Sequence, residues 1–327
     1  MHFCMNLLQW AYKTAEEYRR ELEVTQMNSP SFCSRTWLVA AVLGTAWSAI
    51  HAQGTPVDRG RYLVTTVMAC GNCHTPKDAQ GRALAGKELA GGGIVFDTPP
   101  FAGPAANITP DAETGIGSWS DDEIKRAITH GERPDRGPLA GKRLALPMAT
   151  NFFKAILPGD LDAIVAYVRS VPAVRNVLPA PIYRAPVRHQ AFAVADRGFS
   201  ASDLQNEVRR GEYLATIGHC LECHTPMKDG VLQLNSALGA GGRPFMPSFV
   251  KGLPEAWKGA VSRNLTADPE RGLGAWSDAE IKRAITQGIG RDGRRMAEPM
   301  PYAWYAGIRE DDLDAIVAYL RTLAPKR

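Results

Sequence analysis

Two short stretches decide the fold of this chain, Cys70-Gly-Asn-Cys73-His74 and Cys220-Leu-Glu-Cys223-His224. Each stretch places two residues between its two thiols, so that in a helix the thiols lie about one turn apart on one face. An imidazole follows directly after the second thiol in both stretches. Two copies of so specific a pattern in one chain indicate two equivalent sites.

The pattern Cys-x-x-Cys-His is the attachment motif of c-type haem. Its thiols add across the porphyrin vinyl groups, and its histidine reaches the iron from the same face. A redox-active Cys-x-x-Cys would not require the histidine, and a zinc site made from both pairs would lack the compact ligand spacing of zinc fingers. We therefore expect two covalently bound haem c groups, held by four cysteines and two proximal iron ligands: Cys70, Cys73, His74, Cys220, Cys223 and His224.

A sequence repeat supplies a candidate second ligand for each iron. The stretch that begins Asp160-Leu-Asp-Ala-Ile recurs from Asp312, and the same offset places Pro147-Met148 on Pro299-Met300. A methionine thioether opposite histidine raises the potential of a haem. Methionine is often only flexible core filler, but the matched positions favour ligation. Both methionines are therefore predicted to be distal iron ligands.

Other polar residues near these motifs receive weaker assignments. Arg143 and Arg295 each precede a candidate methionine by five residues. A buried haem propionate needs a cation or hydrogen-bond donors, so both arginines are candidates for propionate binding, with a plain surface role as the alternative. His130 and His219 have no histidine counterpart in the repeat and are predicted to lie at the surface. No residue is assigned a catalytic role.

Each half of the chain has the pattern of three main helices. The first helix precedes the motif, and the spacing from Tyr62 to its motif exceeds that from Tyr213 by one residue. A capping box starts the next helix in both halves, Ser120–Glu123 and Ser277–Glu280. The last helix carries a core-facing stripe at i, i+3, i+4 and i+7: Leu161, Ile164, Val165 and Val168, repeated as Leu313, Ile316, Val317 and Leu320.

These motifs, with Asn107-Ile-Thr-Pro-Asp and Gly115-Ile-Gly-Ser-Trp-Ser between them, resemble the cytochrome c subunits of bacterial periplasmic alcohol, aldehyde and gluconate dehydrogenases. The resemblance implies that the chain takes electrons from a dehydrogenase subunit. It would pass them to a downstream cytochrome, oxidase or quinone-linked complex. Those subunits commonly carry three haems and a C-terminal membrane-binding segment. This chain has two motifs and ends soon after its last helix, so membrane association is expected to be peripheral at most.

The expected fold is all-α, with two tandem class I cytochrome c-like domains at residues 53–171 and 201–327. A proline-containing linker at residues 172–200 is expected to run between them as an extended connector. The formal net charge of +4, without a basic cluster, argues against nucleic acid as a partner.

Residues 1–52 are predicted to be a targeting segment, with Met27 as a candidate true start. Arg35 leads into an apolar run at residues 36–50 and then to Ala52, which is the pattern of a secretory signal cleaved after a small residue. A membrane anchor is the alternative, but the run is shorter than the ~20 residues that span a bilayer. The chain is therefore expected in the periplasm.

Two classes of function remain after this reasoning. The first is an electron-transfer protein, because a His–Met pair on both irons leaves no position open for substrate. The alternative is a dihaem enzyme with one open haem, such as a peroxidase or a sulfur-compound oxidase. The symmetry of the two Pro-Met pairs favours electron transfer. A redox sensor is a minor option, since no signalling segment is fused to the motifs.

Overall fold

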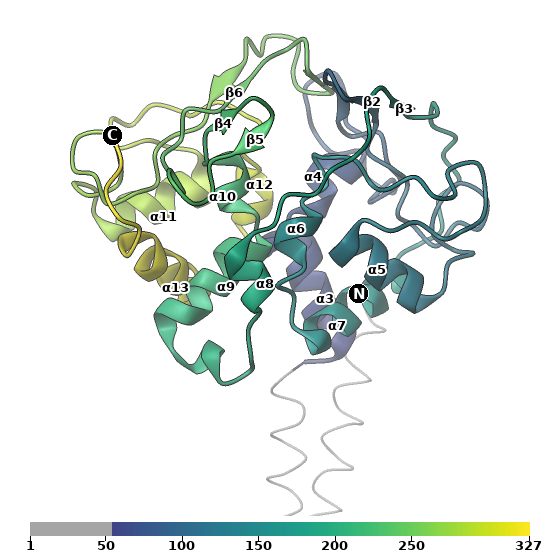
Figure 1. Cartoon of the computed structure of the whole chain (residues 1–327), viewed down its shortest axis with the longest axis horizontal. Coiled ribbons are helices and arrows are strands. Elements are labelled where there is room, and N and C mark those ends of the chain that lie inside the picture. Colours follow the sequence, from purple (N-terminus) through teal and green to yellow (C-terminus); the bar gives the residue numbers. More distant parts are fainter. Residues whose placement is uncertain (1–53) are drawn as a thin grey trace, which may run out of the picture. The chain divides into compact units, whose positions relative to one another are not determined.

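The computed structural model of the chain describes residues 54–327 (Figure 1). The predicted signal segment and the candidate start at Met27 lie outside the described residues. Thr55–Arg327 forms one compact unit that contains both attachment motifs. No helix of this described part is long and apolar enough to cross a membrane.

The elements of the first half follow one another in a simple order. They are α3 (Pro56–Tyr62), the π-helical turn η1 (Leu63–Val67), α4 (Cys70–His74), β1 (Val95–Asp97), β2 (Phe101–Pro104), α5 (Asp121–His130), α6 (Thr150–Phe153) and α7 (Pro158–Ser170). The connecting segment then contributes β3 (Ile182–Tyr183) and α8 (Ala193–Arg197).

The second half repeats the helical part of this order. It consists of η2 (Asp203–Gln205), α9 (Glu207–Ile217), α10 (Cys220–Cys223), β4 (Met227–Lys228), β5 (Val231–Leu232), β6 (Pro244–Phe245), β7 (Val250–Lys251), β8 (Ala260–Val261), α11 (Asp278–Gln287), α12 (Tyr302–Tyr305) and α13 (Glu310–Arg321). The division into two domains at residues 53–171 and 201–327 stays a prediction.

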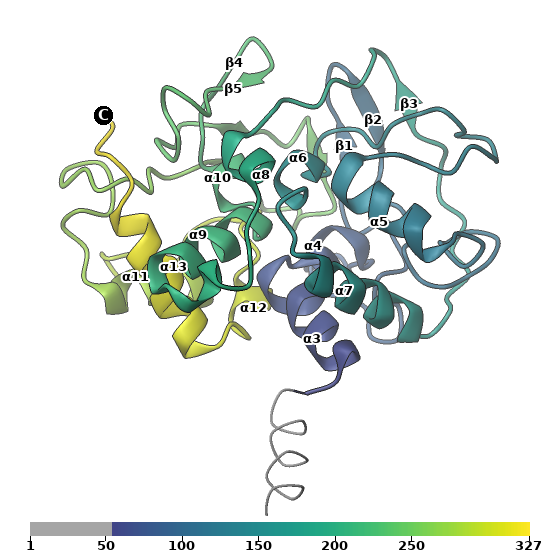
Figure 2. The same cartoon turned by 60° about the horizontal axis from the view of Figure 1, so that its bottom comes forward.

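A glycine in the first helix of each half lets that helix approach the last helix closely (Figure 2). A Cβ on Gly60 in α3 would lie 1.9 Å from the carbonyl oxygen of Ala163 in α7. A Cβ on Gly211 in α9 would lie 1.8 Å from the carbonyl oxygen of Ala315 in α13. The core-facing stripes predicted on the last helices are confirmed, since seven of their eight side chains are buried and Leu161 is partly buried.

The extra residue between Tyr62 and its motif is absorbed by a π-helical turn. In the first half η1 (Leu63–Val67) replaces the end of an α-helix, whereas α9 stays α-helical up to Ile217. A π-helical turn accommodates one more residue than an α-helical turn. Both routes then reach a residue in the left-handed region, Ala69 at φ 48° and His219 at φ 45°, directly before the first cysteine.

The two predicted capping boxes are confirmed. The Ser120 and Ser277 hydroxyls accept from the amides of Glu123 and Glu280, whose carboxylates accept from the serine amides in return. An arginine near the end of each last helix then binds the loop before the box. Arg169 donates to the carbonyl of Trp119, and Arg321 donates to the carbonyl of Trp276.

The expected all-α fold is wrong. Helices make up 34% of the described residues and strands 8%. The segment after α4 is rich in glycine and proline, which do not continue a helix, and its backbone groups are satisfied by antiparallel pairing instead. In the register of β1 and β2, Val95 pairs with Pro104. The sheet order β3-β2-β1-β7 adds a strand from the connecting segment and one from the second half.

Reciprocal hydrogen bonds join the two halves. The Tyr62 hydroxyl of the first half donates to Asp312 Oδ2 of the second at 2.6 Å. The Tyr213 hydroxyl of the second half donates to Asp160 Oδ2 of the first, also at 2.6 Å. Arg59 donates to both oxygens of Asp160 at 2.8 Å. Because both tyrosines and both aspartates occupy matched positions in the repeat, this contact has approximate two-fold symmetry.

Candidate functional site

Each attachment motif forms one short helical turn whose first cysteine packs against the core. Cys70 and Cys220 are partly buried and pack against the main hydrophobic cluster. Burial raises the pKa of Cys70 to about 12 and that of Cys220 to about 11. Redox-active Cys-x-x-Cys motifs have a lowered thiol pKa. These thiols therefore do not resemble a disulfide oxidoreductase site.

The histidine of each motif is oriented by one hydrogen bond. The Nδ1 atom of His74 donates to the carbonyl oxygen of Ala106 at 2.6 Å, and that of His224 donates to the carbonyl oxygen of Arg263 at 2.6 Å. Burial lowers the pKa of both imidazoles, which favours the neutral form. This bond fixes the tautomer and leaves Nε2 with a free lone pair for iron. The donor set of two thiols and one oriented imidazole therefore fits haem c at both turns.

The loops that provide these carbonyl oxygens are anchored by matched asparagines. Asn107 and Asn264 follow the acceptor residues, and each side-chain oxygen accepts from a threonine amide and hydroxyl two residues later. The Nδ2 atom of Asn107 donates to the carbonyl of Val174 at 2.7 Å, and that of Asn264 to the carbonyl of Lys326 at 2.6 Å. The segment after each last helix thus holds the loop that orients the histidine.

The two candidate distal methionines occupy equivalent positions. Met148 lies before α6 and Met300 before α12, both are partly buried, and both pack against the core cluster that Cys70 and Cys220 also contact. The carbonyl of Met148 accepts from the Thr150 amide at 2.8 Å, and that of Met300 accepts from the amide two residues later at 3.0 Å. Iron ligation by either methionine stays a prediction.

The structure places the two candidate propionate arginines at the surface. Arg143 and Arg295 are both exposed, and Arg143 forms an ion pair with Glu132 at 3.4 Å. The structure therefore adds no support for propionate binding by either side chain. His130 is exposed as expected, whereas His219 is not at the open surface but partly buried, with its ring edge-on to Phe153 at 5.8 Å between centroids.

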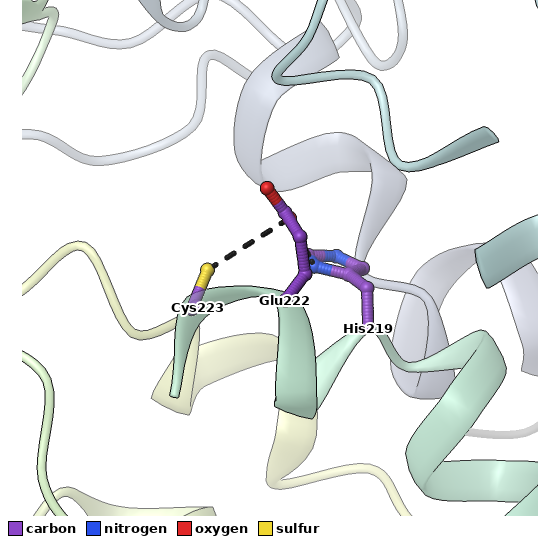
Figure 3. Close-up of side chains that lie close together, drawn as sticks. All are labelled: His219, Glu222 and Cys223. Atoms are coloured by element: carbon purple, nitrogen blue, oxygen red, sulfur yellow. Dashed lines mark hydrogen bonds and ion pairs between the residues drawn. The ribbon is translucent and has the colours of Figure 1, made fainter. Parts of the chain in front are cut away.

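A buried ionic cluster beside the second motif was not predicted (Figure 3). Glu222 accepts from the guanidinium of Arg243 at 3.2 Å, and its Oε2 atom lies 3.5 Å from Nδ1 of His219. Only 7% of the Glu222 side chain is exposed. Comparing the repeats position by position could have found this cluster, because the first half has neutral residues at the matched positions.

The first attachment turn contacts the segment that carries Met300. Asn72 Nδ2 donates to the carbonyl oxygen of Pro299 at 3.3 Å. A Cβ on Gly71 would lie 2.2 Å from the ring of Trp304, so the indole is packed directly against the turn. The two candidate sites are therefore adjacent in the structure.

Comparisons with known proteins agree with this chemistry. Residues 208–324 match the cytochrome c family. The chain is 31% identical to the cytochrome c subunit of a quinone-dependent alcohol dehydrogenase from Gluconacetobacter polyoxogenes, over 84% of this chain and 57% of that protein. It is 28% identical to the gluconate 2-dehydrogenase cytochrome c subunit of Pantoea cypripedii, over 88% of this chain and 65% of that protein. A diheme cytochrome c-type protein of Cereibacter sphaeroides is 29% identical over 77% of this chain and 81% of its own length.

The first two of these relatives are longer than the part that this chain matches. The chain spans 57% of the alcohol dehydrogenase subunit and 65% of the gluconate 2-dehydrogenase subunit. The similarity alone therefore does not assign the substrates or the partners of those complexes to this chain.

Proposed function

The chain is a c-type cytochrome related to the cytochrome c subunits of bacterial dehydrogenases, and from this premise we propose that it is a periplasmic dihaem electron carrier. One haem c is held in each half, at residues 53–171 and 201–327. The function is the movement of single electrons rather than the conversion of a substrate.

The duplicated attachment turn is the observation that carries this proposal. Each copy combines two partly buried thiols with a histidine whose Nδ1 is bonded to a backbone carbonyl. Haem c supplies a one-electron Fe(III)/Fe(II) couple when it is bound. The protein holds each imidazole in the tautomer that presents Nε2, and it packs one matched methionine per half against the core. With Met148 and Met300 as distal ligands, neither iron would bind an external substrate.

The contact between the two halves supports electron transfer within the chain. The turn that carries Cys70 and Cys73 packs on Trp304 and is hydrogen-bonded to the residue before Met300. The reciprocal Tyr–Asp bonds hold this arrangement. These contacts place the first attachment turn against the segment that carries Met300, which would favour electron exchange between bound haems.

The partners follow from the names of the relatives. The donor is proposed to be the catalytic subunit of a dehydrogenase for alcohols or sugar acids, and the acceptor a downstream cytochrome, oxidase or quinone-linked complex. The periplasm is the proposed compartment because the apolar run at residues 36–50 has the pattern of a secretory signal.

Two measurements test this function on the matured holoprotein. Carbon monoxide is added after reduction, and a pure electron carrier shows no spectral shift because both irons are six-coordinate. The holoprotein is then mixed with purified alcohol or gluconate dehydrogenase catalytic subunit and its substrate. Substrate-dependent reduction of both haems supports the proposal. Ready carbon monoxide binding, or peroxide turnover without a dehydrogenase, would instead favour the dihaem enzyme.

A further inference from the structure

Among the positions at which the two attachment turns differ, three near the haem-binding residues change from neutral to ionisable. The amide of Gly91 donates to the His74 carbonyl, and the amide of Gly241 donates to the His224 carbonyl. Gly91 and Gly241 are therefore equivalent positions, and the residues that follow them can be matched one by one. At the three matched positions the first site has neutral residues and the second has ionisable ones. The first set is Ala69, Asn72 and Gly93, and the second is His219, Glu222 and Arg243.

The ionisable set forms a clamp on the second attachment turn. Arg243 Nη1 donates to the backbone carbonyl of Glu222 at 2.8 Å and to its Oε1 atom at 3.2 Å. Only 17% of the Arg243 side chain and 7% of the Glu222 side chain are exposed. The guanidinium also lies over the ring of Phe245, 5.3 Å from its centroid. One arginine therefore fixes both the backbone and the side chain of a residue inside the motif.

The carboxylate of this pair lies beside an attachment sulfur (Figure 3). Glu222 Oε2 is 4.0 Å from the sulfur of Cys223. His219, Glu222 and Cys223 place their ligand atoms within 4.8 Å of one another, the spacing of a metal site. A thioether to haem would take the sulfur out of such a site, and Arg243 already neutralises the carboxylate. An ion pair next to the haem therefore describes the cluster better than a metal site does.

A buried ion pair of this kind is poorly explained by stability. Desolvation of two buried charges offsets most of their attraction, and apolar replacements of such pairs are often neutral or stabilising. The first half builds its equivalent turn without any of these charges. Fixed charges close to a haem do act on its electron affinity: a carboxylate favours ferric iron and a guanidinium favours ferrous iron.

We propose that the Glu222–Arg243 pair positions the second attachment turn and separates the reduction potential of the haem bound there from that of the first haem. The proposal deepens the proposed function and rests on two haems being bound. The two haems then fill with electrons in a fixed order, which the duplicated scaffold alone would not impose. Both residues are positioning residues, since neither binds the iron.

The test measures the two midpoint potentials by spectroelectrochemistry of the matured protein, after its haem content is confirmed to be two per chain. Met300→His replaces the predicted ligand of the second haem by one that lowers the potential. The reduction wave that moves to lower potential in this variant is therefore the wave of the second haem, called the second wave below. Glu222→Gln removes the negative charge and should raise that potential. Arg243→Met removes the positive charge and should lower it. A unit charge at roughly 10 Å and an effective dielectric constant near 20 changes the reduction equilibrium at least about tenfold, which is about 59 mV.

Three further variants separate electrostatics from folding. The double variant Glu222→Gln/Arg243→Met leaves the second turn as neutral as the first and should bring the two midpoint potentials closer together. Arg243→Lys, which keeps the charge, should shift the second potential less than Arg243→Met. The control Arg175→Met removes a cation from an exposed pair with Glu113 and should leave both waves in place. Two waves that stay fixed in Glu222→Gln and Arg243→Met would overturn the inference. A wild-type protein with fewer than two haems would instead overturn the proposed function beneath it.

Discussion

Gly60→Ala is expected to separate the first helix of the first half from the last one. The new Cβ would lie 1.9 Å from the Ala163 carbonyl oxygen, 2.5 Å from the Ala163 carbonyl carbon and 2.8 Å from the Tyr167 Cβ. Ordinary contact begins near 3.4 Å, so the two helices must move apart by about 1.5 Å. The atoms in the way belong mostly to backbone and cannot rotate aside.

The energetic cost should be large for a single methyl group. Overpacking of a tight core costs ~1–3 kcal/mol and sometimes more, and here the whole length of the α3–α7 contact is affected. The gain in helix propensity from glycine to alanine returns only ~1 kcal/mol. We therefore expect a net destabilisation of about 1–2 kcal/mol, because a displacement of this size places the overpacking cost toward the upper end of its range.

Gly159→Ala is the matched control within the same pair of helices. Gly159 lies in α7, has nothing within 4 Å of an added Cβ and has no left-handed φ. This variant should be neutral or slightly stabilising. The assay is urea unfolding of the haem-loaded protein, followed by far-ultraviolet circular dichroism and by haem absorbance. A Gly60→Ala midpoint equal to that of the wild type would refute the close approach of α3 to α7.

Two further predictions concern the contact between the halves and the response to acid. Tyr213→Phe removes the buried donor to Asp160 and should lower the free energy of unfolding by ~1.5–3 kcal/mol, since the bond is to a charged group. Tyr62→Phe should lower it less, because Tyr62 is only partly buried. An unchanged urea midpoint for Tyr213→Phe would contradict the role of this bond. Hydrogen bonds from Arg136 and from the Ser120 amide hold the pKa of Glu123 at about 2. A carboxylate whose pKa is lowered by folding stabilises the folded state fully at pH values above its pKa in the unfolded chain. For Glu123 this stabilisation is lost as the pH falls from about 4.5, the pKa in the unfolded chain, to about 2, the pKa in the folded protein. Arg136→Met should raise the Glu123 pKa in a carboxyl-selective NMR titration, and an unaltered titration would rule out this account of the helix start.

The features that could be predicted from the sequence depend on residues close together in the chain. The capping boxes at Ser120 and Ser277 need only a serine and a glutamate three positions later. The stripes on the last helices follow from helical periodicity. The extra residue after Tyr62 signalled a different helix exit, and the structure resolves it as a π-helical turn.

The features that were missed depend on distant partners. The strand β1 pairs with β7, so that Val95 faces Lys251, and no local pattern announces such a pairing. The bond from Tyr62 to Asp312 likewise joins residues that become neighbours only when the two halves pack. His219 was predicted at the surface because its counterpart Ala69 is not a histidine. Its ring instead packs edge-on against Phe153, which lies on α6 of the first half.

The most direct test of whether both haems serve only to carry electrons is the optical spectrum of the matured protein, combined with its haem content. An electron carrier with two His–Met haems should contain two haem c per chain and show a long-wavelength methionine-to-iron band whose strength corresponds to two ferric haems. Replacing Met148 or Met300 by alanine should each remove half of that band and open one iron to carbon monoxide after reduction. A wild-type band worth one haem or none, with carbon monoxide binding in the unmodified protein, would contradict the claim that both haems serve only to carry electrons.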